Sequence, residues 1–214
     1  MSDASDHFSR RRTLRLLLST PALLAMNTPA SAAGKLATRP IPKSGEALPV
    51  IGLGTWQVFD VGADAAARAR LREVLERFVA GGAKLIDSSP MYGSSESVVG
   101  DLSHALGLRP KLFLATKVWT QGREDGIEQM ERSMRRMQAG SSIDLIQVHN
   151  LVDVATHTKT LLEWKAKGRV RYLGITHYTA SGHAALAGFT SSKWPAPSTR
   201  RWVTSSPFIW ATAS

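Results

Sequence analysis

The fold of this sequence is decided by the stretch Lys84-Leu85-Ile86-Asp87-Ser88-Ser89-Pro90-Met91-Tyr92-Gly93. A short apolar run ends at Asp87, and the proline and glycine that follow are typical of a loop. Tyr92 lies in that loop, five residues beyond Asp87. The stretch therefore predicts a buried strand that carries a carboxylate at its C-terminal end and a phenol close by.

Similar apolar runs recur along the chain and alternate with segments of helical periodicity. The expected strands are 48–55, 84–88, 112–118, 143–149 and 170–176, and the expected helices are 65–80, 95–106, 127–138 and 154–167. This alternation is typical of parallel βα units, so we expect an α/β fold of the (β/α)8 TIM-barrel type. Because a full barrel has eight strands and about 250 residues, we expect an incomplete barrel with about five or six of its βα units.

The first residues, 1–32, have the pattern of an export signal. Arg10, Arg11 and Arg12 precede the apolar run 16–26, and small residues follow at 30–32. The pattern resembles the signal that the bacterial twin-arginine translocase reads, although a basic amphipathic helix is an alternative. The apolar run is shorter than the about 20 residues of a membrane-spanning helix. We therefore expect a periplasmic or exported protein that has the translocase as a partner during export and no stable membrane anchor.

The remaining chain divides into a linker (33–47), a partial barrel (48–187) and an irregular tail (188–214). The tail is rich in Ser, Thr and Pro and holds half of the six tryptophans, and no Asp or Glu follows Glu163. We interpret this change as a shift of the reading frame near 184–188 followed by early termination. A real but irregular C-terminal extension is the alternative.

Composition excludes some functions and argues against others. The net charge is +10, but four arginines lie in the N-terminal segment, and we find no basic stripe with interleaved aromatic residues. We therefore do not expect a nucleic-acid partner. The sequence has no cysteine, which excludes a disulfide, a thiolate metal site and a cysteine nucleophile. Its histidines show no ligand pattern, so we expect no metal site.

Ionisable residues end three successive expected strands. Asp87, Lys117 and His149 take these positions, and Tyr92 follows the first of them. Each has a structural explanation when taken singly: a helix cap, a surface charge, a core histidine and a packed loop aromatic. Barrel enzymes build their sites on the C-terminal ends of the strands, so the four residues together predict one convergent site.

The motifs around these four residues resemble those of the aldo/keto reductase family, whose tetrad is Asp, Tyr, Lys and His in this order. The resemblance covers about 48–178 and implies hydride transfer from a nicotinamide cofactor, usually NADP(H), to a small aldehyde or ketone. It makes Asp87, Tyr92, Lys117 and His149 the expected catalytic residues. Tyr92 would protonate the carbonyl oxygen, Lys117 would lower the pKa of Tyr92, Asp87 would hold Lys117, and His149 would orient the substrate.

The resemblance also suggests binding residues. We expect cofactor contacts from Gly54, Thr55, Asp87, Asn150 and Thr176, and a substrate wall from Trp56 and Trp119, with core packing as the alternative for Trp56.

The sequence departs from the family in two ways. His177 stands where the family commonly has Asn in a Ser-Asn pair. We find no basic segment for the adenosine phosphate of NADP(H), so we expect this part of the site to be missing. Two interpretations stay open: an oxidoreductase, or a truncated, catalytically inactive barrel fragment that binds no cofactor.

Overall fold

The core of the fold is a parallel sheet. The computed structural model describes residues 36–41, 44–192, 202–203 and 209–213, all within the unit Gly34–Ser214. Five consecutive strands pair in parallel and in chain order: β3 (Gly52–Gly54), β4 (Leu85–Asp87), β5 (Phe113–Val118), β6 (Ile143–His149) and β7 (Val170–His177). This arrangement confirms the expected α/β fold of an incomplete TIM barrel.

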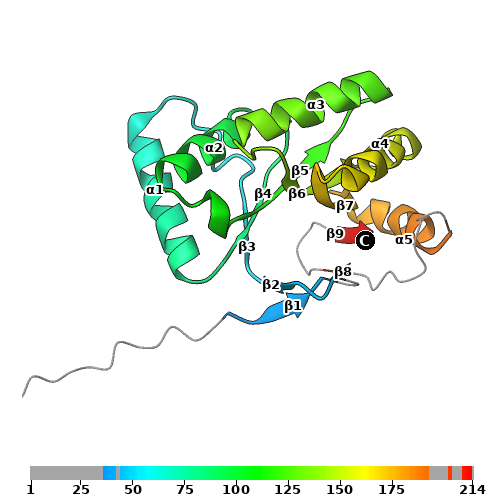
Figure 1. Ribbon diagram of the computed structural model, residues 1–214, viewed down its shortest axis with the longest axis horizontal. Coiled ribbons are helices and arrows are strands. Elements are labelled where there is room, and N and C mark those ends of the chain that lie inside the picture. Colours follow the sequence, from blue (N-terminus) through cyan, green and yellow to red (C-terminus); the bar gives the residue numbers. More distant parts are fainter. Residues whose placement is uncertain (1–35, 42–43, 193–201, 204–208, 214) are drawn as a thin grey trace, which may run out of the picture. The chain divides into compact units, whose positions relative to one another are not determined.

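The helices connect these strands and lie on the outer side of the sheet (Figure 1). The main helices are α1 (Ala65–Ala80), α2 (Ser95–Ala105), α3 (Arg123–Arg136) and α4 (Val154–Ala166), followed by α5 (His183–Ser192), and the short 3-10 turns are η1 (Arg109–Lys111) and η2 (Ala180–Gly182). Helix α1 begins where the Asp64 side chain accepts a hydrogen bond of 2.9 Å from the Ala67 N–H. Helix α3 begins four residues earlier than predicted, because Glu124 and Asp125 supply the acidic first turn that a helix N-terminus favours.

The first predicted strand, 48–55, is wrong as a single element. It is divided between β2 (Ala47–Pro49) and β3, and β2 pairs in antiparallel fashion with β1 (Thr38–Pro40), which lies in the segment predicted as a linker. Pro49 has no N–H for a continuing ladder, and the next two residues, Val50 and Ile51, are exposed. The N-terminal part of the fold is therefore a hairpin followed by a short strand.

The two faces of the sheet have different neighbours. Outward residues such as Leu114, Ile146 and Leu173 join the helices in the larger apolar cluster. Inward residues form a second cluster with the hairpin: Ile41, Phe113, Ala115, Leu145 and Tyr172. Because side chains alternate along a strand, Lys117 and His149 also face inward, beyond this cluster.

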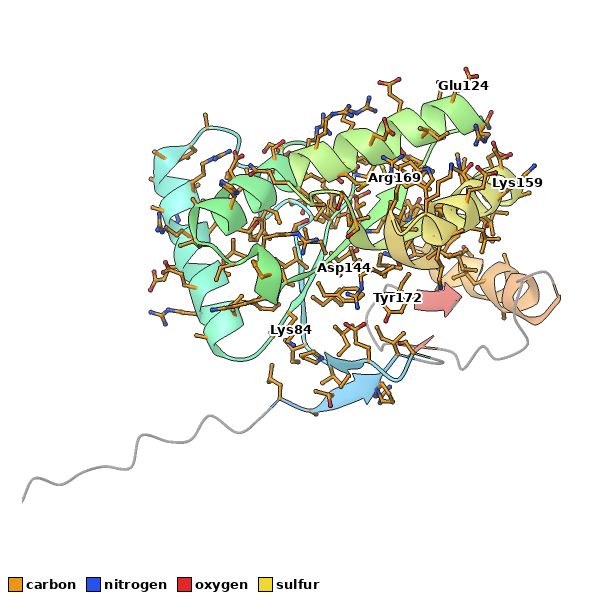
Figure 2. The ribbon with its side chains drawn as sticks, viewed as in Figure 1. Lys84, Glu124, Asp144, Lys159, Arg169 and Tyr172 are labelled. Carbon is orange, nitrogen blue, oxygen red and sulfur yellow. The ribbon has the colours of Figure 1, made fainter. Side chains whose placement is uncertain are left out.

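The hairpin is tied to the sheet by polar contacts as well. The Tyr172 hydroxyl donates to Glu46 Oε2 at 2.5 Å and lies 3.0 Å from Ser44 Oγ. Arg171 pairs with Glu46 and, at 2.6 Å, with Asp144 Oδ1. Figure 2 labels Asp144 and Tyr172 on the part of the sheet that faces the hairpin. These contacts fix the N-terminal ends of the strands, opposite the predicted site.

Part of the predicted irregular tail has regular backbone structure. Strand β9 (Ile209–Ala213) pairs in antiparallel fashion with β7, and β8 (Trp202–Val203) pairs with β9. The frameshift remains a prediction, and the predicted signal, 1–32, lies outside the described residues. Among the residues that the structure describes, no helix is both long enough and apolar enough to cross a membrane.

Candidate active site

Three of the predicted catalytic residues meet at the C-terminal ends of the strands. Asp87 ends β4, Lys117 lies one residue before the end of β5, and His149 ends β6. Asp87 is the lateral partner of Ala115, and Lys117 is the lateral partner of Gln147. Because lateral partners share a face and side chains alternate along each strand, all of these residues point to the inner side of the sheet.

Asp87 and Lys117 form a buried ion pair. The Lys117 ammonium lies 3.0 and 2.8 Å from the two Asp87 carboxylate oxygens and 2.7 Å from Ser88 O, and Lys117 is 1% exposed. Burial raises the pKa of Asp87, while the Lys117 charge and the nearby Gln147 amide act in the opposite direction. An ammonium has three N–H donors, so these three contacts engage all of them.

Tyr92 lies beside this pair. The Lys117 ammonium is 4.9 Å from the centroid of the Tyr92 ring. We expected Lys117 to lower the pKa of Tyr92, and its charge does act in that direction. Burial outweighs it, however, and the Asp87 charge adds to burial, so the pKa of Tyr92 lies above its usual value of 10. In this arrangement Tyr92 is a protonated phenol at neutral pH.

The loop that carries Tyr92 is held by the loop that follows β3. Ser94 donates from its backbone N–H and from its hydroxyl to Asp60 Oδ1, both at 2.8 Å. Gly93 has a φ of 57°, and a Cβ at this position would lie 2.3 Å from the Asp60 carboxylate. Only glycine fits this backbone conformation and this close approach, so the position of Tyr92 depends on Gly93 and Asp60.

His149 is neutral at physiological pH. It is 7% exposed, and burial lowers its pKa to about 4, with the charges of Lys117 and His177 acting in the same direction. Its Nδ1 has no hydrogen-bond partner among the described residues. A neutral imidazole has one N–H donor and one acceptor, so His149 can present an N–H to a carbonyl oxygen.

Aromatic rings flank His149 on two sides. The ring centroids of Trp119 and Tyr178 lie 6.0 and 6.1 Å from that of His149, and the two aromatic residues are 43% and 59% exposed. Trp119 thus lies beside the predicted catalytic residue His149, and its role as a substrate wall remains a prediction. Trp56 is 57% exposed on the loop after β3, so it is not part of the core. Among the described residues, its ring makes no contact with the rings of the predicted catalytic residues.

Two of the predicted cofactor residues are joined to each other. The Asn150 N–H donates to Thr176 O at 2.8 Å, and Thr176 is 1% exposed. The Asn150 Oδ1 atom is buried without a hydrogen-bond partner in the described part of the chain. A buried acceptor without a donor is costly, so this oxygen fits an N–H of a bound molecule, such as the amide group of a nicotinamide.

Of the remaining predicted cofactor residues, Asp87 is engaged by Lys117, and Gly54 and Thr55 differ from each other in exposure. Gly54 is exposed at the end of β3, beside Asp87 in the sheet. Thr55 is fully buried, and its hydroxyl lies 3.0 Å from Asp87 O and 2.9 Å from Ser88 Oγ. The Thr55 hydroxyl therefore holds the ends of β3 and β4 together instead of facing open space.

Sequence reasoning missed Tyr178 and Gln147. Gln147 is 1% exposed, and neither polar atom of its amide has a hydrogen-bond partner of standard geometry among the described residues. The alternation of side chains along a strand offered the signal, because Leu145, Gln147 and His149 are spaced two residues apart. A polar residue between an inward leucine and an inward histidine must itself face inward.

A second buried acid lies on the outer side of β5. The Thr116 hydroxyl donates to Glu96 Oε1 at 2.6 Å, and Arg136 lies 3.8 Å from Glu96 Oε2. Burial raises the pKa of Glu96, with Thr116, Ser133, Arg136 and Lys117 acting in the opposite direction. Glu96 belongs to α2, and its partners are Thr116 on the outer face of β5 and Arg136 on α3. Within the described ranges, no group of three or more His, Asp or Glu side chains is placed to hold a metal ion.

Comparison with known proteins gives the same family as the sequence motifs. Residues 50–199 match the model of the aldo/keto reductase family. Methylglyoxal reductase YeaE of Escherichia coli is 34% identical over 136 residues, which cover 61% of this chain and 46% of YeaE. The chain spans about half the length of the curated relatives it matches.

Solved structures that resemble this chain are also aldo/keto reductases. An aldo/keto reductase from Klebsiella pneumoniae in complex with NADP and acetate is 29% identical, with a TM-score of 0.51 over 63% of this chain and 47% of that one. An aldo/keto reductase from Brucella melitensis has a TM-score of 0.56 over 73% of this chain and 59% of its own, at 24% identity, which shows the fold alone.

Proposed function

Because the chain belongs to the aldo/keto reductase family of oxidoreductases, we propose that it reduces the carbonyl group of a small aldehyde or ketone with NADPH. The observation that carries this proposal is the convergence of the buried Asp87–Lys117 pair, Tyr92 and a neutral His149 at one end of the sheet. The unpartnered Asn150 Oδ1 beside Thr176 fits the nicotinamide end of the cofactor. NADPH would supply the hydride when bound.

The side chains would divide the remaining work. His149 would donate its N–H to the substrate carbonyl oxygen and orient it, which a cationic imidazole at this buried position would do at a higher cost. Tyr92 would then give its proton to the same oxygen. The phenolate that remains needs a nearby cation, which Lys117 supplies, and Asp87 keeps that cation in place.

We propose a 2-oxoaldehyde such as methylglyoxal as the substrate class. Several relatives are named methylglyoxal reductases, and the rings of Trp119 and Tyr178 beside His149 offer an apolar wall for a small carbonyl compound. We also propose that residues 1–32 direct export through the twin-arginine translocase, on the support of Arg10, Arg11 and Arg12. Replacing Arg11 and Arg12 by lysine in a fusion to a periplasmic reporter would then abolish export.

The test of the reductase activity is oxidation of NADPH by the purified chain in the presence of methylglyoxal. We expect saturable turnover that is lost in Tyr92→Phe, because only the acidic hydroxyl is removed. Tyr172→Phe is the matched control, since it makes the same change near the hairpin, and it should retain turnover. A folded chain that neither binds nor oxidises NADPH would refute the proposal and leave an inactive barrel fragment.

A further inference from the structure

The Lys117 ammonium faces a conflict of hydrogen bonding. Its three donors are engaged by the two Asp87 oxygens and by Ser88 O. To stabilise a phenolate at Tyr92, one of these donors has to turn to the Tyr92 oxygen. When the donor that turns is one of the two on Asp87, that carboxylate, which burial already disfavours, loses a hydrogen bond. Another donor has to replace it if the pair is to stay ionised.

Gln147 is placed to be that donor. It is the lateral partner of Lys117 on one side and of Gly174, which has no side chain, on the other. Along its own strand the inward neighbours of Gln147 are Leu145, which is apolar, and His149. The polar groups that this buried amide faces are therefore the ion pair and His149.

The state of the Gln147 amide supports this placement. Neither its nitrogen nor its oxygen has a hydrogen bond of standard geometry in the part of the chain that the structure describes, although burial of such groups is costly. The amide is nevertheless close enough to Asp87 to favour the carboxylate form. A small rotation of the side chain, or one bridging water, would complete a hydrogen bond.

We propose that Gln147 is a positioning residue that takes over as hydrogen-bond donor to Asp87 and thereby releases one N–H of Lys117 to the Tyr92 oxygen. No proton changes place in this exchange; one donor replaces another at the same carboxylate. The inference deepens the proposed function, since it assumes that Tyr92 is the acid. It concerns an equilibrium within the protein, however, and can be measured without substrate or cofactor.

The titration of Tyr92 reports this exchange. The groups that face Tyr92 and the pair are Asp87, Lys117, His149 and, farther along β7, His177, while Glu96 lies behind β5. His149 is neutral throughout the alkaline range, because its pKa is about 4. A change in the phenolate population of Tyr92 therefore reports how well Lys117 stabilises it.

The experiment is an alkaline titration of the full chain by ultraviolet absorbance, with the Tyr92 signal obtained by subtracting the Tyr92→Phe variant. Gln147→Met keeps the size of the side chain and removes the donor. We expect about tenfold less Tyr92 phenolate at a given pH below the midpoint, which is the effect of one hydrogen bond to a charged group. Gln147→Asn, which retains the amide, should recover part of the difference.

Ser133→Ala is the matched control, since its hydroxyl is also buried without a partner of standard geometry but belongs to α3 on the other side of the sheet. It should titrate like the parent. An unchanged titration in Gln147→Met, or an equal change in Ser133→Ala, would overturn the inference. If Gln147→Met does not fold, Gln147→Asn is the deciding variant, because its shorter side chain places the amide one methylene farther from Asp87. A titration of Tyr92 in Gln147→Asn that is identical to that of the parent would then overturn the inference. The titration needs neither substrate nor cofactor, so it tests the role of Gln147 even if the chain has no reductase activity.

Discussion

The effects of replacing Asp87 and Lys117 on the free energy of unfolding should be strongly coupled, because the two side chains form a buried ion pair. Asp87→Asn leaves the Lys117 ammonium buried without a counter-ion, and Lys117→Met leaves the carboxylate alone. Removal of one partner of a buried pair costs about 3–5 kcal/mol, because an unpaired charge stays in a medium of low dielectric constant. Removal of both partners should cost much less than the sum, since no charge then remains buried.

Urea unfolding at pH 7, followed by tryptophan fluorescence, measures these differences. With a slope of about 2 kcal/mol per molar urea, each single variant should unfold at a midpoint about 1.5–2.5 M below the parent. The double variant should recover at least half of the combined loss. Such a recovery is the signature of direct interaction in a double-mutant cycle.

An exposed pair provides the control. Glu73 and Arg77 lie 2.6 Å apart on α1, with side chains 59% and 80% exposed. Glu73→Gln should change the unfolding free energy by less than about 1 kcal/mol, because water screens the pair. The reasoning fails if Asp87→Asn costs no more than Glu73→Gln, or if the losses of the two single variants simply add in the double variant.

Two further predictions concern the outer side of the sheet. Burial raises the pKa of Glu96, so the stability that its protonated form contributes is complete below the ordinary value of 4.5 and is lost as the pH rises through the folded pKa. Glu96→Gln should therefore flatten the decline of the urea-unfolding free energy as the pH rises above 4.5, and a pH profile identical to that of the parent would contradict this prediction. A Cβ at Gly100 would lie 2.0 Å from Arg136 O, so Gly100→Ala should force α2 and α3 apart and lower the melting temperature by about 3–9 °C, which corresponds to about 1–3 kcal/mol of overpacking. Gly188→Ala, at a position with open space, should leave the melting temperature within about 2 °C of the parent, and equal effects of the two changes would count against the steric argument.

The regular elements follow from the sequence where periodicity is strong. Helix α1 was expected at 65–80 and spans Ala65–Ala80, because Leu71 and Leu75 make one apolar face and Gly81-Gly82 ends it. Strand β6 has the expected bounds because it is buried on both faces and four of its seven residues are aliphatic: Ile143, Leu145, Ile146 and Val148. The convergence of Asp87, Lys117 and His149 then follows from their equivalent places in parallel strands.

Other features depend on contacts between distant segments. The hairpin of β1 and β2 forms because Ile41 and Leu48 pack under inward residues of β5 and β7, which no local pattern reveals. The raised pKa of Tyr92 reflects a balance between burial and the charge of Lys117, and only the structure gives the extent of burial. The antiparallel pairing of β9 with β7 was likewise unexpected, since the tail lacks the periodicity of a strand.

The hydrogen bonds from Ser94 to Asp60 couple two loops that an evolving binding site would otherwise vary separately. The loop after β3 bears Trp56, and the loop after β4 bears Tyr92. A substitution that reshapes the first loop for a new ligand therefore also displaces the phenol. Diversification of ligand preference should proceed more readily through Trp119 and Tyr178, which border His149 without being part of that linkage.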